Sequence, residues 1–361
     1  MRVTLENVCE KGSSNLKQSD VTNMTGDYPI YGAAGHIGNA DFYHQDKPYV
    51  AVVKDGAGIG RTTLHPAKSS VIGTMQYLLP KDNVLPEYLY YVVRHMRLEK
   101  YFTGATIPHI YFRDYKSEEF NLDSLDKQAE IIGILGKVEG IVQKRKQQIT
   151  ELDNLVKARF VEMFGDPVSN PKGWPVQNFE DISILITDGE HATPRRSENG
   201  IYLLSARNVL NHTLQLDDVD FIDEDEYNRI ARRVIPQEGD VLISCSGSIG
   251  RCCVVPANMR FQMVRSAALI RFTDAINPIY AEWLITSDEL QRQIAQSATQ
   301  SSQANLFQGK IQKLHGYVPP KALQDEFALF VIQTDKSKAV VQKALDEAQT
   351  LFDSLMQQYF G

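Results

Sequence analysis

The chain repeats itself at long range, and this duplication constrains its fold more than any local pattern does. Residues 52–61 (VVKDGAGIGR) resemble residues 242–251 (LISCSGSIGR), and a proline follows each copy at the same offset. Residues 122–165 match residues 318–361 without a gap. In this match Gln128, Glu130, Leu155, Phe164 and Gly165 recur as Gln324, Glu326, Leu351, Phe360 and Gly361. A weaker match relates residues 5–8 to 179–182, so the two halves share one plan and differ by insertions.

The gapless match predicts two long helices, over 123–166 and 318–361. Apolar residues recur there in alternating steps of four and three, which is the pattern of a heptad seam. The pattern is interrupted at Arg145 and Arg159 in the first helix and at Thr334 and Lys338 in the second. At 1.5 Å per residue, roughly 35 helical residues make a rod of about 50 Å. We expect the two helices to pair as an antiparallel coiled coil; the alternative is that each lies on its own globular neighbour. The seam positions are Ile131, Leu135, Val138, Val142, Ile149, Leu152, Val156 and Met163, then Phe327, Val331, Val341, Leu345, Ala348, Phe352, Leu355 and Tyr359.

Residues 1–122 and 167–317 are predicted to be globular domains of the α+β class. Short β-rich runs alternate there with glycine-rich turns. Helices are expected to begin at Pro86 and Pro278, since proline is favoured in the first turn. Gly165-Asp166-Pro167 is a stop signal for the first long helix. The fold class is therefore α+β, with two globular domains separated by two long paired helices and related by pseudo-twofold symmetry. The predicted strands are residues 49–53, 76–79, 241–243 and 267–270.

The charge of the chain argues against a uniformly basic nucleic-acid binder. Lys+Arg 38 against Asp+Glu 45 gives a net charge of −7, spread over 361 residues that are enough for two domains. Acidic residues are concentrated in one stretch of the second domain, residues 217–226. Most basic residues of that domain are arginines, whose planar forks suit phosphates and guanine edges. We therefore expect a basic face opposite a local acidic loop.

No catalytic or metal-binding pattern is recognisable. Gly56-Ala57-Gly58-Ile59-Gly60 is not followed by GK[ST] and lacks GxGxxG spacing, so a tight turn is expected instead of a phosphate loop. Asp188, Glu190, His191 and Ser205 lack the GxSxG elbow of a hydrolase. The histidines and Cys245 show no metal-ligand spacing. The glycine-rich cofactor loop of S-adenosylmethionine methyltransferases is also missing, as are helicase and nuclease motifs.

Two further patterns concern the compartment. The four cysteines, Cys9, Cys245, Cys252 and Cys253, form no CxxC pair and are expected to be buried and reduced. No apolar run is long enough to span a bilayer, and the first residues lack the apolar core of a signal peptide. We expect a cytoplasmic protein without membrane contact.

With its order of motifs, the chain resembles the specificity subunits of type I restriction–modification systems. The resemblance covers essentially the whole chain. It rests on the duplicated plan and on three motifs of the second half: TDGEHATP at 187–194, GIYLLSARNV at 200–209, and GDVLIS at 239–244 leading into GSIGR at 247–251. In the first half, YPIYGAAGHIG at 28–38 resembles another frequent variant of the target recognition domain.

The resemblance implies a DNA sequence-specificity subunit that is itself not an enzyme. Residues 1–122 and 167–317 would be target recognition domains, each reading one half of a bipartite, asymmetric double-stranded DNA target. The helices at 123–166 and 318–361 would fix the spacing and dock two modification (adenine methyltransferase) subunits, and a restriction subunit is a possible further partner. No cofactor is expected on this chain: S-adenosylmethionine, ATP and Mg would belong to partner subunits.

By analogy, loop residues beside the glycine turns are the candidate DNA contacts. Arginine and lysine would bind phosphates or guanine, whereas histidine and serine would reach base edges. Two alternatives stay open: a protein-interaction scaffold with duplicated binding modules, and an enzyme with a duplicated α+β domain. The candidates are His36, Lys54, Arg61 and Lys68 in the first domain, and His191, Arg195, Arg196, Arg207, Ser244 and Arg251 in the second.

Overall fold

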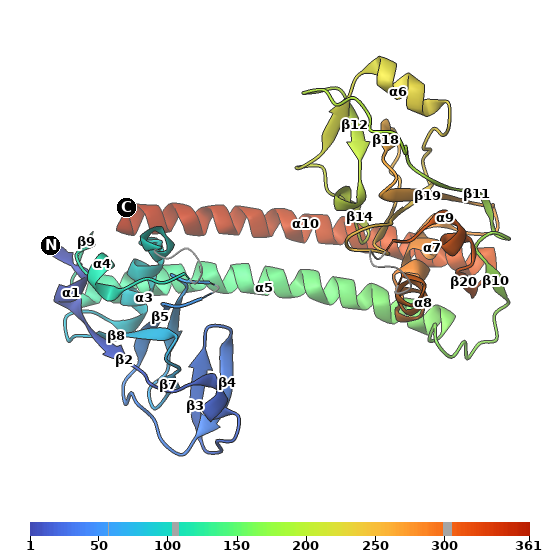
Figure 1. Cartoon of the computed structure of the whole chain (residues 1–361). Coiled ribbons are helices and arrows are strands. Elements are labelled where there is room, and N and C mark those ends of the chain that lie inside the picture. The colour runs from blue at the N-terminus through green and yellow to red at the C-terminus, as the bar shows by residue number, and fades with distance from the viewer. Residues whose placement is uncertain (57, 103–107, 299–304) are drawn as a thin grey trace. The chain divides into compact units, whose positions relative to one another are not determined.

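The computed structural model describes residues 1–56, 58–102, 108–298 and 305–361 (Figure 1). Its contacts divide the chain into two compact units. Unit 1 is Met1–Gln148 with Val341–Gly361, and unit 2 is Ile149–Val340. The long helices α5 (Leu125–Phe164) and α10 (Lys321–Phe360) match the predicted segments and each contribute to both units. The compact units therefore divide the chain differently from the four predicted segments, because each unit combines one globular domain with parts of both helices.

Unit 1 contains two main sheets. An antiparallel sheet has the strand order β2-β8-β5-β6, and a smaller one has the order β4-β3-β7, in which β3 pairs antiparallel with β4 and parallel with β7. Strands β1 and β9 form a separate pair. The strands are β1 (Arg2–Thr4), β2 (Cys9–Ser13), β3 (Tyr28–Gly32), β4 (Gly35–Ala40), β5 (Tyr49–Val53), β6 (Thr62–His65), β7 (Ser70–Val71), β8 (Met75–Pro80) and β9 (Glu119–Asn121).

Unit 2 repeats this topology. Its sheets have the orders β11-β19-β16-β17 and β15-β12-β18, with the same antiparallel and parallel pairings, and β10 pairs with β20 as β1 does with β9. The duplication predicted from the sequence is thus confirmed for these sheets, and only the pair β13–β14 of unit 2 has no counterpart among the described strands of unit 1. The strands are β10 (Val176–Asn178), β11 (Ser183–Asp188), β12 (Ile201–Leu204), β13 (Val209–Leu210), β14 (Thr213–Leu214), β15 (Asp220–Ile222), β16 (Val241–Ser244), β17 (Cys252–Val254), β18 (Phe261–Met263), β19 (Ala267–Phe272) and β20 (His315–Tyr317).

Short helices cover the sheets. The prediction that helices begin at Pro86 and Pro278 is confirmed by α3 and α7. The helices of unit 1 are α1 (Leu5–Val8), α2 (Gln18–Val21), α3 (Pro86–His95), η1 (Leu98–Tyr101) and α4 (Phe112–Tyr115). Those of unit 2 are η2 (Ala206–Asn208), α6 (Glu224–Ala231), α7 (Pro278–Ile285), α8 (Asp288–Ala298) and α9 (Gln308–Gln312).

The two long helices pack on each other within each unit. In unit 1, Leu135 of α5 and Phe352 of α10 belong to one core. In unit 2, the ring centroids of Phe160 and Phe327 lie 5.4 Å apart. The ion pairs Asp153–Lys338 and Arg159–Glu326 run in opposite sequence directions along the two helices, so the pairing is antiparallel, as predicted.

Two equivalent glutamines fasten the long helices to the globular domains. Gln128 is fully buried; its Oε1 accepts from the Leu85 N–H at 2.8 Å, and its Nε2 donates to the carbonyls of Asn83 and Asp123. Gln324, also fully buried, makes the same three bonds, to the N–H of Asn277 and the carbonyls of Ala275 and Pro319. The duplication therefore extends to individual hydrogen bonds.

The expectation for the cysteines is confirmed: all four are free and buried. Burial raises the pKa of the Cys9 and Cys245 thiols to about 12, so both remain protonated at neutral pH. Within the described residues, no helix combines the length and the apolar character needed to cross a bilayer.

Candidate DNA interface

In each unit, several chain segments meet at the same end of the two sheets. We call this the strand-end surface. The backbone bonds that hold it recur in both units: the N–H of Lys54 donates to Thr74 as that of Cys245 does to Ser266, at 3.0 and 2.7 Å. In unit 1 the surface comprises residues 14–18, 32–36, 54–56, 58–61, 72–74 and 108–110, and in unit 2 residues 189–191, 205–207, 245–251, 264–266 and 305–306.

Glycine-rich turns form part of both surfaces, as the sequence predicted. Gly58 and Gly60 have φ of +86° and +79°, and Gly247 and Gly250 have φ of +69° and +85°. Only glycine adopts this region without a steric cost, which explains why glycines recur there. Each turn closes through the same bond, from Gly60 N–H to the Val53 carbonyl in unit 1 and from Gly250 N–H to the Ser244 carbonyl in unit 2, both 2.9 Å.

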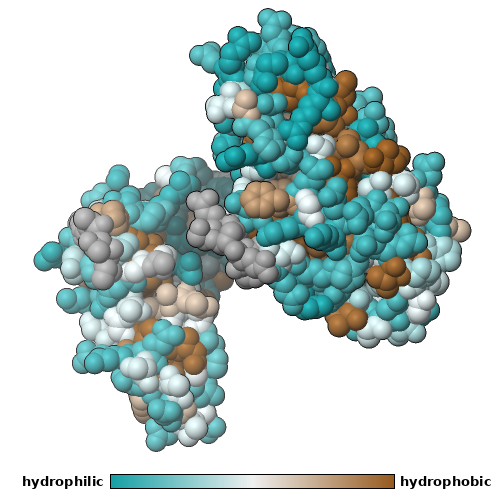
Figure 2. Space-filling view, turned by 45° about the vertical axis from the view of Figure 1, so that its right-hand side comes forward, coloured by the Kyte–Doolittle hydropathy of each residue, from teal (hydrophilic) through white to brown (hydrophobic). Residues whose placement is uncertain are grey.

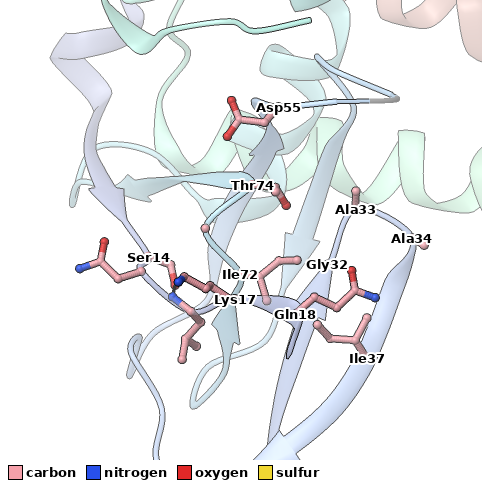
Figure 3. Close-up of a pocket in the computed structure, with 13 residues that line it drawn as sticks. Ser14, Lys17, Gln18, Gly32, Ala33, Ala34, Ile37, Asp55, Ile72 and Thr74 are labelled. Atoms are coloured by element: carbon pink, nitrogen blue, oxygen red, sulfur yellow. Dashed lines mark hydrogen bonds between the residues drawn. The ribbon is translucent and has the colours of Figure 1, made fainter. Parts of the chain in front are cut away.

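A cavity of about 560 Å³ opens in the strand-end surface of unit 1 (Figure 3). Its walls combine small residues such as Gly32, Ala33 and Gly73 with polar ones such as Lys17 and Asp55. These residues come from segments at or near the ends of different strands, so only the tertiary fold brings them together. The remaining lining residues are Ser14, Asn15, Leu16, Gln18, Ala34, Ile37, Ile72 and Thr74.

Three of the four predicted contacts of unit 1 lie at this surface. Lys54 follows β5, Arg61 ends the glycine turn and donates to the Ala33 carbonyl at 3.0 Å, and His36 is exposed at the start of β4, 2.8 Å from the Asn39 side-chain oxygen. Lys68 does not join them. Lys68 lies in the loop between β6 and β7. Because β6 runs antiparallel to β5, this loop lies at the opposite end of β6 from the glycine turn.

The arginines predicted for unit 2 are engaged with the acidic stretch. Arg196 Nε lies 3.0 Å from Asp220, and Arg207 Nη2 lies 3.2 Å from the same carboxylate. Arg195 contacts Glu226 through both its backbone N–H and its guanidinium. The expected separation of a basic face from an acidic loop is therefore wrong: the two pack together. The surface over α6 is accordingly hydrophilic (Figure 2).

The TDGEH motif anchors neighbouring cations. Asp188 lies 2.8 Å from His191 and also binds Arg233, and Glu190 lies 3.5 Å from Arg229. Arg229 also hydrogen-bonds Glu226, which is 3% exposed, and thereby holds the pKa of that carboxyl near 2. His191 itself is exposed at the strand-end surface.

The last two predicted residues have different environments. Ser244 is fully buried; its hydroxyl donates to the Ser248 carbonyl at 2.6 Å and accepts from Arg251 N–H at 3.0 Å. This leaves the hydroxyl no surface for DNA, and Ser244 instead shapes the turn. Arg251 directly follows Gly250 and is half-buried, and its guanidinium has no partner within the described part of the chain.

Further polar groups of these surfaces were not among the sequence candidates. Lys17 lines the cavity, and His109 Nδ1 lies 2.5 Å from Asp55. Arg265 lies in the turn between β18 and β19. The duplication allows the two halves to be aligned by their strands. Such an alignment would identify the loops of Lys17 and Arg265 as parts of the two equivalent surfaces. Among the described residues, no group of His, Cys, Asp and Glu side chains is arranged to hold a metal ion.

Comparisons with known proteins point to one family. Residues 1–151 match the family model of the type I restriction modification DNA specificity domain. The type I restriction enzyme MjaIX specificity subunit of Methanocaldococcus jannaschii is 27% identical over 137 residues, 33% of this chain and 32% of that protein. The MjaVIII specificity subunit of the same organism is 22% identical over 215 residues, 55% of this chain and 50% of that protein. The aligned regions thus span a third to a half of these relatives.

Solved structures extend the likeness to the whole fold. The S subunit of a type I restriction-modification system from M. genitalium has a TM-score of 0.65 and 14% identity, covering 100% of this chain and 96% of that one. A chain from a structure on complex assembly and conformational transition of the type I R-M system has a TM-score of 0.55 and 14% identity, covering 99% and 97%. Residues 1–151 are therefore a type I restriction modification DNA specificity domain, in a chain whose whole length has the fold of a type I specificity subunit.

Proposed function

We propose that this chain is the DNA sequence-specificity subunit of a type I restriction–modification complex, in which each unit reads one half of a bipartite, asymmetric duplex target. The observation that carries the proposal is that one backbone frame occurs twice with different side chains. Lys17, Ala34 and Gly73 occupy the strand-end surface of unit 1, whereas His191, Arg207 and Arg265 occupy that of unit 2. Two such surfaces suit two different half-sites.

Exposed and half-buried cations give these surfaces the chemistry for DNA. Lys54 and Arg61 flank the glycine turn of unit 1; in unit 2, Arg251 ends the glycine turn and Arg265 lies in the turn between β18 and β19. Lysine and arginine bind phosphates, and the arginine fork also matches the two acceptors of guanine in the major groove. A smaller role in DNA binding is expected for Arg195, Arg196 and Arg207. Each would have to break its ion pair with an acidic residue of this chain before it could bind DNA.

The long helices would fix the spacing of the half-sites and dock two modification subunits. Each helix passes without interruption from residues of one unit to residues of the other. Equivalent leucines remain uncovered on them: Leu155 is 50% exposed and Leu351 is 51% exposed. Two like apolar positions suit two copies of the same partner. A restriction subunit would join such a complex.

In this proposal the chain itself is not catalytic. S-adenosylmethionine, ATP and Mg would be bound by the modification and restriction subunits. This division of labour accords with the absence of a methyltransferase cofactor loop from the sequence.

The test is to produce the chain with its modification subunit in cells that lack other adenine methylation and to sequence the methylated sites. We expect one bipartite motif with a fixed gap. Replacing residues 167–317 by the corresponding domain of another specificity subunit should change one half-site only. Scattered methylation, or methylation independent of this chain, would refute the proposal and favour the scaffold alternative.

A further inference from the structure

The turn between β18 and β19 presents an arginine, Arg265, whose side chain has no partner among the described residues. Arg265 is exposed, and within the described residues its guanidinium forms no hydrogen bond, ion pair or ring contact. Its backbone is held firmly: Arg265 N–H donates to the Glu190 carbonyl at 3.0 Å, and Ala267 N–H donates to the Val264 carbonyl at 2.9 Å. A free guanidinium on a fixed backbone is suited to binding a group from outside the chain.

The neighbouring chain segments tie this turn to the rest of the strand-end surface. Ser266 accepts a hydrogen bond from Cys245 N–H through its carbonyl and one from Ala206 N–H through its hydroxyl. The turn therefore lies between the 205–207 loop and the glycine turn, within the surface that also contains His191. Its place there does not depend on any bond of the Arg265 side chain.

The carboxylates of residues 188–190, the segment whose backbone is hydrogen-bonded to this turn, are already paired with other cations. Asp188 binds Arg233 and His191. Glu190 lies 3.5 Å from Arg229, and its Oε1 accepts from Ala192 N–H at 2.9 Å. An arginine that no carboxylate neutralises attracts an anionic or acceptor-rich ligand such as DNA.

Unit 1 has a glycine at the equivalent position. Gly73 N–H donates to the Leu16 carbonyl at 2.7 Å, as Arg265 N–H does to that of Glu190. A Cβ at Gly73 would lie 3.1 Å from the Ser14 carbonyl oxygen, so little space for a side chain exists there. Gly73 instead lines the cavity of unit 1. The same backbone position thus carries a long cation in one unit and no side chain in the other.

We propose that Arg265 is a specificity-determining residue: its guanidinium contacts the edge of one base, guanine by its fork geometry, in the half-site that unit 2 reads. This inference rests on the proposed function. Contact with a base is favoured over contact with a phosphate because hydrogen bonds with the backbone of residues 190, 206 and 245 fix the position of the turn. A bidentate contact requires that the backbone carrying the arginine be held in place. The contrast with Gly73 gives the two half-sites different requirements at this position.

The experiment compares Arg265→Ala, Arg265→Lys and the unchanged full-length chain, each produced with the modification subunit, by sequencing the methylated sites. We expect Arg265→Ala to relax one position of one half-site, with discrimination there reduced about 10- to 100-fold, the range typical of one bidentate base contact. Arg265→Lys keeps the charge but loses the fork, so it should relax the same position with a smaller loss of total methylation.

Lys313→Ala is the matched control, since Lys313 is exposed near the start of β11, whereas the strand-end surface lies beyond its end. It should leave the motif unchanged. An unaltered motif in Arg265→Ala, with methylation either equally reduced at all sites or unaffected, would overturn the base contact. If the unchanged chain directs no bipartite motif, the proposed function itself fails, which separates the two results.

Discussion

Single polar residues decide how the globular domains are joined to the long helices. Gln128 and Gln324 each satisfy one N–H and two carbonyls that would otherwise be buried without partners. A buried polar group that loses its hydrogen bond costs about 1–3 kcal/mol. Each of these two side chains therefore stabilises its junction through three hydrogen bonds at once.

Gln324→Ala is expected to lower the free energy of unfolding of unit 2 by about 2–4 kcal/mol, because three backbone groups lose their partner at once. Both tryptophans, Trp174 and Trp283, belong to unit 2, so urea unfolding followed by tryptophan fluorescence reports on this unit. Gln333→Ala, which removes an exposed glutamine from the same helix, should shift the transition by less than about 0.5 kcal/mol. Equal shifts in the two variants would contradict the assigned role.

Glu226 gives the second domain a defined sensitivity to acid. Its hydrogen bond with Arg229 lowers its pKa in the folded state from the ordinary 4.5 to about 2. A carboxyl with a depressed pKa stabilises the fold above pH 4.5, and this contribution is lost as the pH falls toward 2. The urea midpoint of Glu226→Gln should therefore lie below that of the unchanged chain at pH 7, and the difference should shrink between pH 4.5 and 2. Asp225→Asn, at an exposed neighbour, should show no such convergence.

At the scale of elements, the heptad seam and the strand order have different origins. The seam is a local repeat, and its residues are buried where the two helices meet: Leu135 is fully buried and Phe352 is 3% exposed. The sheet order β2-β8-β5-β6 brings together strands far apart in sequence. Helix pairing therefore follows from periodicity, whereas the strand-end surfaces follow from topology.

Inserting one heptad into both long helices is expected to lengthen the gap between half-sites without changing either half-site. Suitable points lie between Gln148 and Ile149 and between Val340 and Val341, where the chain passes from one unit to the other. Seven residues add about 10 Å of helix and preserve the seam. That length equals roughly three base pairs of B-DNA. Sequencing of methylated sites measures the gap, and an unchanged gap would show that the helices do not set it.

At the scale of the whole molecule, the net charge of −7 no longer opposes DNA binding. Several acidic residues of the stretch 217–226 form ion pairs with arginines of the same chain, as Glu224 does with Arg260 at 2.6 Å. At the strand-end surface of unit 2, Arg251 and Arg265 form no ion pair within the described residues. The strand-end surfaces carry few cations, so we expect their electrostatic attraction to phosphates to be small.

The isolated chain is therefore expected to bind duplex DNA weakly and to lose affinity only gradually between about 50 and 200 mM salt, because few counterions are released. Addition of the modification subunit should both tighten binding and steepen the salt dependence. Fluorescence anisotropy of a labelled duplex that contains the methylated motif measures both quantities. Tight binding with a steep salt dependence by the chain alone would contradict this account.

The duplication, the two long helices and the glycine turns are predictable from the amino-acid sequence, because each depends on residues close together in the chain or on a repeat. Which polar side chains are available to bind DNA depends instead on the tertiary fold. Arg196 and Arg207 are paired with Asp220, Ser244 is buried, and Lys68 lies away from the other candidates. Ion pairs and burial depend on contacts between distant segments, which no local pattern encodes. For the same reason the sequence does not single out Arg265. The carboxylates of Asp188 and Glu190 are paired with Arg233 and Arg229, and such pairs are visible only in the fold.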